Sequence, residues 1–421
     1  MSFFLVRPLQ AQFLMDMVDT TREMGQGLLN IYRDFGNLRV SGYIQPQFQL
    51  ASGAGAPSWI GGDFPPNVAN RFMLRRGRIR FDYLYFPKND GPSVHFVFQF
   101  DGTERGVYIR DFWGRLFENK WKLFSMTTGM FARPFGFELN LSSADRESPE
   151  RGRMSQILMR TERDLGVMFS LDARRPDHPL KQFKLDAGFF NGQGLQATTD
   201  FDNRKDFITR LSVKPWVISK SGMKLSGSVS WLHGAIIQNT PFVARTSNGQ
   251  VWLDSSAANQ GRYAPRQYYG ADVQWTIPTK LGKTKLRAEI IRGTQTATDS
   301  TSETPAKLLT NREVYYRRPF QGAYFYFLQD VFSPKHQLGV KLDWYDPNRA
   351  VRGRDIAGNG DGFTAADIRF TTLGMGYTYY INEHIKLTLW YDRVWNERTR
   401  LPGFTQDVAD NVLTTRLQYR F

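Results

Sequence analysis

Hydrophobic and polar residues alternate along most of this chain, from residue 38 to the C-terminus. In segment 180–190, for example, Phe183 and Leu185 take one face while Lys184 and Asp186 take the other. A period of two is typical of a β-strand with one apolar and one polar face. The alternation predicts sixteen strands, at 38–50, 70–86, 92–101, 105–117, 120–131, 163–172, 180–190, 206–217, 222–234, 266–277, 283–293, 318–330, 335–346, 366–380, 384–397 and 410–421.

The connections between these segments differ systematically in length. Those after even-numbered segments are short, such as 87–91 and 278–282, whereas those after odd-numbered segments are mostly long, such as 132–162 and 235–265. Short turns at one end and long loops at the other are typical of outer-membrane barrels with both termini in the periplasm. Lipid offers no hydrogen-bond partners, so the sheet must close on itself. We therefore predict an all-β fold, a 16-stranded antiparallel transmembrane β-barrel over 37–421, in a bacterial outer membrane.

The two ends of the chain carry separate signals. The last strand ends at Phe421 with an alternating apolar face, which looks like the recognition signal of bacterial outer-membrane assembly. Residues 1–12 end as the tail of an export signal would, although an ordinary disordered terminus fits them equally well. Residues 13–36 carry apolar side chains mostly three or four apart and predict a short N-terminal helix, either periplasmic or plugging the lumen.

Composition removes several classes of function. No run of 18 uncharged apolar residues occurs, which excludes α-helical membrane spans. The chain has no cysteine, its five histidines are scattered, and neither a Gly-x-Ser-x-Gly elbow nor a phosphate-binding P-loop occurs. We therefore expect no metal, no cofactor and no enzymatic activity. Loop 355–367 partly matches a calcium-binding loop, but a glycine-rich turn is the favoured interpretation.

The charge of the chain favours an anionic partner, because 55 lysines and arginines outnumber 40 acidic residues for a formal net charge of +15. If the apolar faces meet lipid, Arg76, Arg78 and Arg80 point inward as a ladder with steps of about 6.8 Å. The basic residues alternate with lipid-facing ones instead of clustering on one surface, which argues against nucleic acid. The ladder predicts a modestly positive lumen that concentrates anions, and an interior of simply paired charges is the alternative.

The wider inward-facing set contains more bases than acids. Its further bases are Lys184, Arg210, Lys214, Lys224, Lys285, Arg287, Lys341, Lys386, Arg416 and Arg420, and its acids are Asp82, Asp101, Asp164, Asp172, Asp186, Asp272, Glu289, Asp343 and Asp392.

Loop 132–162 is the second candidate for solute contact. It follows the fifth strand, and the loop at this place commonly folds inward and narrows the pore in sixteen-stranded porins. It is rich in arginine, which suits bidentate contact with phosphate-like oxyanions. Its acids leave open that the same charges form salt bridges holding the loop to the wall. The candidate anion-binding residues are Arg76, Arg78, Arg80, Arg133, Arg146, Arg151, Arg153, Lys184 and Arg210.

Several stretches resemble the phosphate-selective porin O/P family in the form found in Bacteroidetes. They are RDFW at 110–113, GMFARPFG at 129–136, RESPER at 146–151, RDLG at 163–166 and TLGMGYTYY at 372–380. The resemblance implies a sixteen-stranded, usually trimeric barrel that passes anions, in some members with phosphate preference based on an arginine ladder and lysines at the constriction. Loop 132–162 has no lysine, which departs from that pattern.

These observations together predict an outer-membrane porin for passive diffusion of small anions, with phosphate as one candidate solute. The expected partners are small anions such as phosphate, outer-membrane lipid and lipopolysaccharide, and two further copies of the chain in a homotrimer. One alternative is a plugged or structural barrel that acts as a binding or assembly component. Another is a channel specific for an organic or sugar anion.

Overall fold

The computed structural model describes residues 37–87, 91–357 and 361–421. The segments predicted as an export-signal remnant (1–12) and as an N-terminal helix (13–36) lie outside the described residues. The barrel strands are β1 (Leu38–Ala51), β2 (Asn70–Tyr85), β3 (Val94–Thr103), β4 (Gly106–Phe117), β5 (Phe124–Ala132), β6 (Arg163–Asp172), β7 (Phe183–Phe190), β8 (Asp206–Val217), β9 (Lys224–Ile237), β12 (Tyr263–Thr279), β13 (Gly282–Ala297), β14 (Tyr315–Val331), β15 (Ser333–Asp346), β16 (Phe370–Tyr380), β17 (Ile385–Asn396) and β18 (Val412–Arg420).

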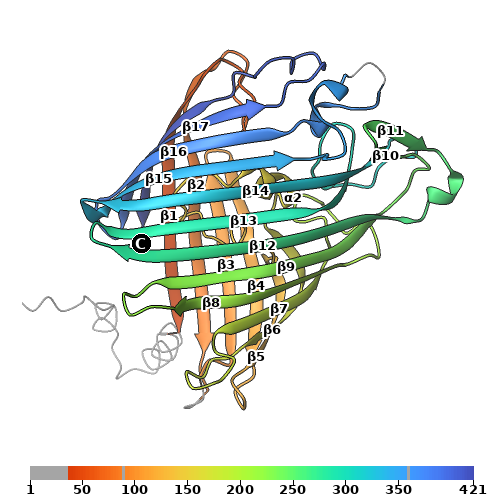
Figure 1. Cartoon of the computed structure of the whole chain (residues 1–421). Coiled ribbons are helices and arrows are strands. Elements are labelled where there is room, and N and C mark those ends of the chain that lie inside the picture. The colour runs from red at the N-terminus through yellow and green to blue at the C-terminus, as the bar shows by residue number, and fades with distance from the viewer. Residues whose placement is uncertain (1–36, 88–90, 358–360) are drawn as a thin grey trace, which may run out of the picture.

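These strands form one closed antiparallel sheet. Each strand pairs with the next along the chain, β9 pairs with β12, and β18 pairs with β1 from Tyr43↔Arg420 to Ala51↔Val412. The prediction of a 16-stranded antiparallel barrel is therefore confirmed, and every barrel strand overlaps one predicted segment. Figure 1 shows the short turns gathered at the end of the barrel that carries the C-terminus and the long connections at the other end.

The long connections contain elements that the alternation did not predict. Strands β10 (Val243–Ser247) and β11 (Gln250–Asp254) form a hairpin beyond the barrel, inside predicted loop 235–265. At five residues each, they are too short to cross a membrane and were not predicted. The remaining elements are α2 (Arg153–Leu158) and the 3-10 helices η2 (Ala257–Asn259), η3 (Gly353–Asp355) and η4 (Ala365–Asp367). Within the described ranges, no helix has the length and apolar character to cross a bilayer.

The strand predicted from residue 120 begins later, at Phe124. The carboxylate of Glu118 accepts hydrogen bonds from the backbone N–H groups of Trp121 and Leu123, which closes a tight turn before the strand. A carboxylate that bonds nearby backbone in this way competes with the strand ladder. The sequence alternation alone carries no sign of that turn.

The strands present apolar side chains outward, as predicted. Phe72 on β2 is 85% exposed, while Arg76 and Arg78 on the same strand are buried. Trp121 and Trp216 lie on the outer surface, where aromatic girdles are expected. Tyr345 differs from these residues, because it is buried on the inward face of β15.

The main apolar core lies inside the barrel and not between two sheets. Phe135, Met154 and Leu158 of the segment between β5 and β6 pack against Tyr268 and Phe320, which point inward from β12 and β14. Burial of these side chains stabilises the segment against the β12–β15 wall. We call residues 133–162 the inner loop from here on. It fills the lumen on that side and leaves the β2–β4 side lined by charged residues.

Candidate functional site

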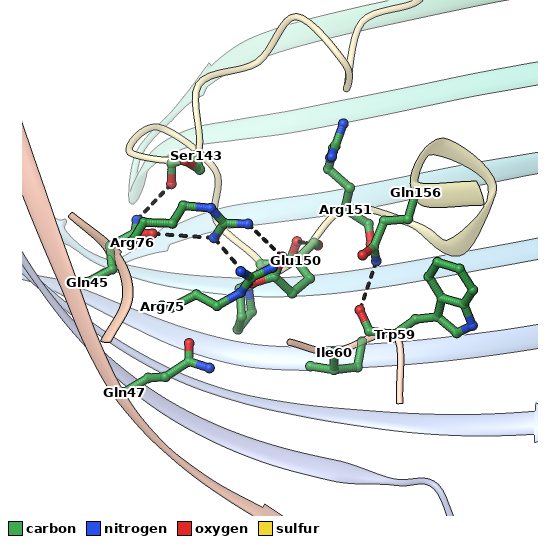
Figure 2. Close-up of polar contacts among 12 residues, drawn as sticks. Gln45, Gln47, Trp59, Ile60, Arg75, Arg76, Ser143, Glu150, Arg151 and Gln156 are labelled. Carbon is green, nitrogen blue, oxygen red and sulfur yellow. Dashed lines mark hydrogen bonds and ion pairs between the residues drawn. The ribbon is translucent and has the colours of Figure 1, made fainter. Parts of the chain in front are cut away.

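The inner loop is tied to the charged wall through Glu150. Its carboxylate accepts from Arg75 Nε at 2.8 Å, from Arg76 Nη2 at 2.8 Å and from Arg416 Nη2 at 2.9 Å, and Figure 2 shows the first two contacts. Burial alone would raise the pKa of Glu150, but Arg75, Arg76 and Arg416 hold it well below its usual range. Three arginines surround one carboxylate, so this cluster carries a net charge of +2. We call such a carboxylate with its surrounding arginines a node.

A bulge in β2 explains how two consecutive arginines reach the same carboxylate. Across from Gln45 on β1, strand β2 has two residues, Arg75 and Arg76, where regular pairing has one. A bulge inserts one extra residue and re-aims its neighbours. Arg75 thus joins Arg76 inside the barrel, although strict alternation would have sent it toward lipid.

A second node surrounds Glu162, at the end of the inner loop. Its carboxylate pairs with Arg110, with Arg151 at 2.7 Å and with Arg163 at 3.4 Å. Arg110 is itself the extra residue of a bulge in β4, because Gln99 pairs with Asp111 while Phe100 pairs with Ile109. Burial would raise the pKa of Glu162, and the surrounding arginines lower it well below the usual range.

On the other side, polar contacts add to the apolar packing of the inner loop. Glu289 Oε2 on β13 accepts from the backbone N–H groups of Phe137 and Glu138 at 3.2 and 3.0 Å. Glu147 of the loop accepts from Arg287 Nη1 at 2.6 Å. The loop is therefore held on both sides and cannot leave the lumen without breaking buried ion pairs.

Two cavities lie along the β2–β4 side of the loop, one toward each end of the barrel. The extracellular cavity, of about 620 Å³, is bordered by the loop between β1 and β2 and by Arg76, Arg110 and Arg151. The periplasmic cavity, of about 470 Å³, opens toward the end with short turns. Arg78 and Glu162 border both cavities. These two side chains therefore mark the narrowing between the two halves of the lumen.

The two cavities differ in charge. Among the residues that the structure describes, the extracellular cavity is lined by six basic and five acidic side chains. The periplasmic cavity has three acidic residues, Asp111, Glu162 and Asp186, against eight basic ones. Those eight are Arg78, Arg80, Arg115, Arg146, Arg163, Lys184, Arg210 and Arg420. An anion entering the periplasmic cavity meets a surplus of positive charge in a confined space.

Most of the wall bases are paired within the wall. Arg78 Nη2 lies 3.0 Å from Asp101, Arg80 Nε 2.7 Å from Asp82, and Lys184 Nζ 2.8 Å from Asp186. Much of the predicted arginine ladder therefore consists of paired charges, which was the alternative interpretation of the sequence. Arg146 differs, because within the described residues its Nε and Nη1 have no hydrogen-bond partner while its side chain is buried at the edge of the periplasmic cavity. Burial lowers the pKa of Arg146.

The structure separates the predicted anion-binding residues into three groups. Arg78, Arg80, Arg146, Lys184 and Arg210 border the periplasmic cavity, and Arg76, Arg78 and Arg151 border the extracellular one. Arg133 and Arg153 border neither. Arg133 donates to the backbone oxygen of Thr161 and lies 4.0 Å from Asp164, whereas Arg153 lies over the ring of Phe370.

Sequence reasoning missed Arg75, Arg110 and Arg163 as lumen residues. The first two enter through bulges, and each stands next to another charged residue that already faces inward. A pair of adjacent charges within an alternating strand is the one sequence signal that could have pointed to them.

Part of the loop that resembles a calcium-binding loop, 355–367, has a structural role instead. Asp367 pairs with Arg318 at 2.8 Å and accepts from the backbone N–H of Thr364, which ties η4 to β14. Asn359 of the same motif lies outside the described residues. In the part of the chain that the structure describes, no group of three or more histidine and carboxylate side chains is arranged to hold a metal.

Comparison with known proteins places the fold. No protein-family model and no curated protein sequence matches the chain. Similar solved structures include the outer membrane channel DcaP of Acinetobacter baumannii (11% identity, TM-score 0.53, covering 91% of this chain and 97% of that one). OmpF of Salmonella typhi, in complex with daunomycin, has 10% identity and a TM-score of 0.54 over 91% and 97% of the two chains. OprB of Pseudomonas putida has 8% identity and a TM-score of 0.55 over 95% and 96%.

At such identities the likeness concerns the fold alone, which is that of porin-like outer-membrane channels. The closed barrel, its apolar outer face and this shared fold make the chain a bacterial outer-membrane β-barrel.

Proposed function

We propose that this barrel is a passive diffusion channel for small anions, related to the phosphate-selective porin O/P family. The observation that carries the proposal is the periplasmic cavity, with eight basic and three acidic lining residues, which meets the extracellular cavity at Arg78 and Glu162. A positively charged vestibule raises the local concentration of anions and repels cations. The route runs along the β2–β4 wall, because the inner loop fills the β12–β15 side.

Conduction requires contacts that are favourable but easily exchanged. Arg78 and Arg80 are partly neutralised by Asp101 and Asp82, so each offers a passing anion a weakened site. Arg146, Lys184 and Arg210 border the same cavity and extend the row of bases. An anion can therefore move between several weak sites without being trapped at one.

Phosphate is the solute we favour within this class. Guanidinium groups bind the oxygens of phosphate in pairs, and arginine outnumbers lysine around the periplasmic cavity. We further propose that the chain works as a homotrimer whose outer face contacts outer-membrane lipid and lipopolysaccharide. The motif resemblance at 110–113, 129–136 and 146–151 supports both points.

The test is planar-bilayer recording of the purified full chain in a potassium chloride gradient, followed by titration with phosphate. We expect open channels with an anion-selective reversal potential and a current that phosphate reduces at low concentration. A cation-selective reversal potential would refute the proposal. Anion selectivity without any effect of phosphate would leave a general anion channel.

A plugged barrel with a binding or assembly role is the second candidate. It is favoured by the two nodes in which Glu150 and Glu162 are each held by three arginines, since these contacts fix the inner loop across the lumen. Absence of conductance from correctly folded protein would select this candidate over the channel.

A further inference from the structure

A third cavity, of about 210 Å³, lies at the extracellular end and apart from the proposed route. It is enclosed by the loop between β1 and β2, by α2, and by the long loops that surround β16 and precede β18. The rings of Trp59, Phe370 and Phe404 line it, together with the charged side chains of Arg153 and Asp410. None of its lining residues borders the periplasmic cavity. We call it the aromatic pocket.

The aromatic pocket adjoins the proposed anion route without belonging to it. The segment 57–59 borders both the aromatic pocket and the extracellular cavity, so it forms the partition between them. Its position is fixed from the inner loop, because Gln156 Nε2 donates to the backbone oxygen of Trp59 at 3.0 Å, as Figure 2 shows. The wall of the aromatic pocket is therefore held in place by the folded loop.

The two charged groups of the pocket are only loosely paired. Arg153 Nη2 lies 3.9 Å from Asp410 Oδ2, and the guanidinium carbon lies 3.6 Å from the centre of the Phe370 ring. The two residues are only 8% and 3% exposed. Among the described residues, neither Arg153 Nε nor Asp410 Oδ1 has a hydrogen-bond partner. Buried polar atoms without partners are costly, and such groups are expected to find one.

The two carboxylates of the aromatic pocket disfavour an anion, and the position of Arg153 disfavours a cation. A cation could use the aromatic rings, but Arg153 already covers the face of Phe370 and would repel it. An anion would meet Asp410 and also Asp63, which lines the same cavity. A neutral ligand with a donor and an acceptor side by side satisfies both groups, because one hydroxyl can accept from Arg153 while its neighbour donates to Asp410.

We propose that the aromatic pocket binds a neutral ring with adjacent hydroxyl groups, of the monosaccharide class. The apolar face of the ring lies against Trp59 and Phe404, and its vicinal hydroxyls bridge Arg153 and Asp410. Mostly apolar walls with a few convergent polar groups are the usual composition of a small-molecule site. This inference goes beyond the proposed anion channel and stands or falls independently of it.

The test uses the full chain in detergent at pH 7.0 and saturation-transfer NMR with four probes. The probes are glucose, galactose, glucosamine as a cation and glucuronate as an anion. We expect transfer to the ring protons of at least one neutral sugar, with affinity at least tenfold weaker for both charged analogues. Preferred binding of glucuronate would show an anion site, and preferred binding of glucosamine a cation cage. Either result would overturn the proposal, as would no transfer to any neutral sugar.

Matched variants locate the binding. Asp410→Asn keeps the size of the side chain but weakens the acceptor, and Trp59→Ala removes the platform. Each should reduce affinity for the neutral sugar at least tenfold, since a site built to hydrogen-bond hydroxyls discriminates strongly. Asp407→Asn is the control, because Asp407 belongs to the same loop but is exposed and pairs with Arg393 at 3.3 Å. Heat-modified migration in gels verifies that each variant is folded, and unchanged affinity in both pocket variants would place the sugar elsewhere.

Discussion

The β2–β4 wall and the β12–β15 wall of the barrel share one strand pattern but differ in the aromatic rings that they present to the lumen. The first directs Arg76, Arg78 and Asp101 inward, and the second adds Tyr268, Phe320 and Tyr324 to its charged residues. The inner loop meets each wall with matching residues. Its carboxylates at 150 and 162 face the arginines, and its apolar side chains pack on the aromatic rings.

The difference shows how one loop both narrows a lumen and leaves a route through it. Aromatic packing excludes water and closes the β12–β15 side, whereas paired charges keep the β2–β4 side polar and able to hold water. The inward-facing residues of each wall, rich in aromatic rings on one side and charged on the other, thus decide on which side of the lumen the route runs. The first three predictions below each change the contacts of the inner loop or the charges on one side of the lumen and leave the other side unchanged.

The largest effect should come from removing the packing on the aromatic wall. The double variant Phe135→Ala and Met154→Ala deletes two buried side chains of the inner loop. Substitutions of this kind cost roughly 2–5 kcal/mol each. We expect the loop to leave its docked position for part of the time, giving larger and noisier single-channel currents than the parent chain.

The control for that variant is Phe325→Ala on β14, which removes a ring of the same size from the lipid-facing side of the same wall. Its channel conductance should equal that of the parent. If the loop variant also conducts like the parent, the charged nodes alone hold the loop, and the aromatic wall has no part in docking.

The second effect concerns the charged wall. Replacing Arg76, Arg78 and Arg80 together with Ala should lower the anion-to-cation permeability ratio without preventing folding, since lumen substitutions tune selectivity. One unit charge at about 4 Å changes the energy of a passing ion by about 1 kcal/mol in water, or roughly fivefold in occupancy. Reversal potentials in a salt gradient measure the change, and we expect a several-fold decrease.

A matched triple variant, Lys214→Ala, Lys224→Ala and Lys283→Ala, tests whether position matters. These bases lie near the short turns at the periplasmic end of the strands and line neither of the two cavities. The control should shift the reversal potential much less than the ladder variant. Equal shifts from both would mean that selectivity follows total lumen charge and not the route along the β2–β4 wall.

The alternation of apolar and polar residues in the sequence was sufficient to predict most of the inward-facing residues of the β2–β4 wall. Arg76, Arg78 and Arg80 were predicted inward from period-two spacing, and the burial of Arg76 and Arg78 agrees with that direction. The bulges that bring in Arg75 and Arg110 were not predictable, because an extra residue is defined by its partner strand. The pairing of Glu162 with Arg110 and Arg151 depends equally on how the inner loop folds, which no local pattern encodes.

The third prediction tests whether the charge of Glu162, at the narrowing between the two cavities, limits the anion-to-cation permeability ratio. Glu162→Gln keeps the shape of the side chain but removes a negative charge from among Arg110, Arg151 and Arg163. The freed arginines should raise the anion-to-cation permeability ratio about twofold to fivefold by the same Coulomb argument. Asp177→Asn, an exposed acid between β6 and β7 that pairs with Arg175 and lines neither cavity, should leave the ratio unchanged. An unaltered or lower ratio in Glu162→Gln would place the selective step elsewhere.

The smallest expected effect is that of pH on selectivity. The pKa values of Glu150 and Glu162 lie well below the ordinary value of 4.5, because the surrounding arginines outweigh the effect of burial. For a carboxylate with a lowered pKa in the folded state, the stabilising contribution is complete above the ordinary value and disappears only as pH falls through the lower one. Among the described residues that line the two cavities there is no histidine, the side chain that commonly titrates near neutrality. Reversal potentials recorded from pH 8 to pH 5 should therefore stay constant, with the inner loop docked throughout. A fall in conductance or selectivity centred within that range would show that another group titrates at the narrowing, and that the two arginine nodes do not by themselves set the charge of the route.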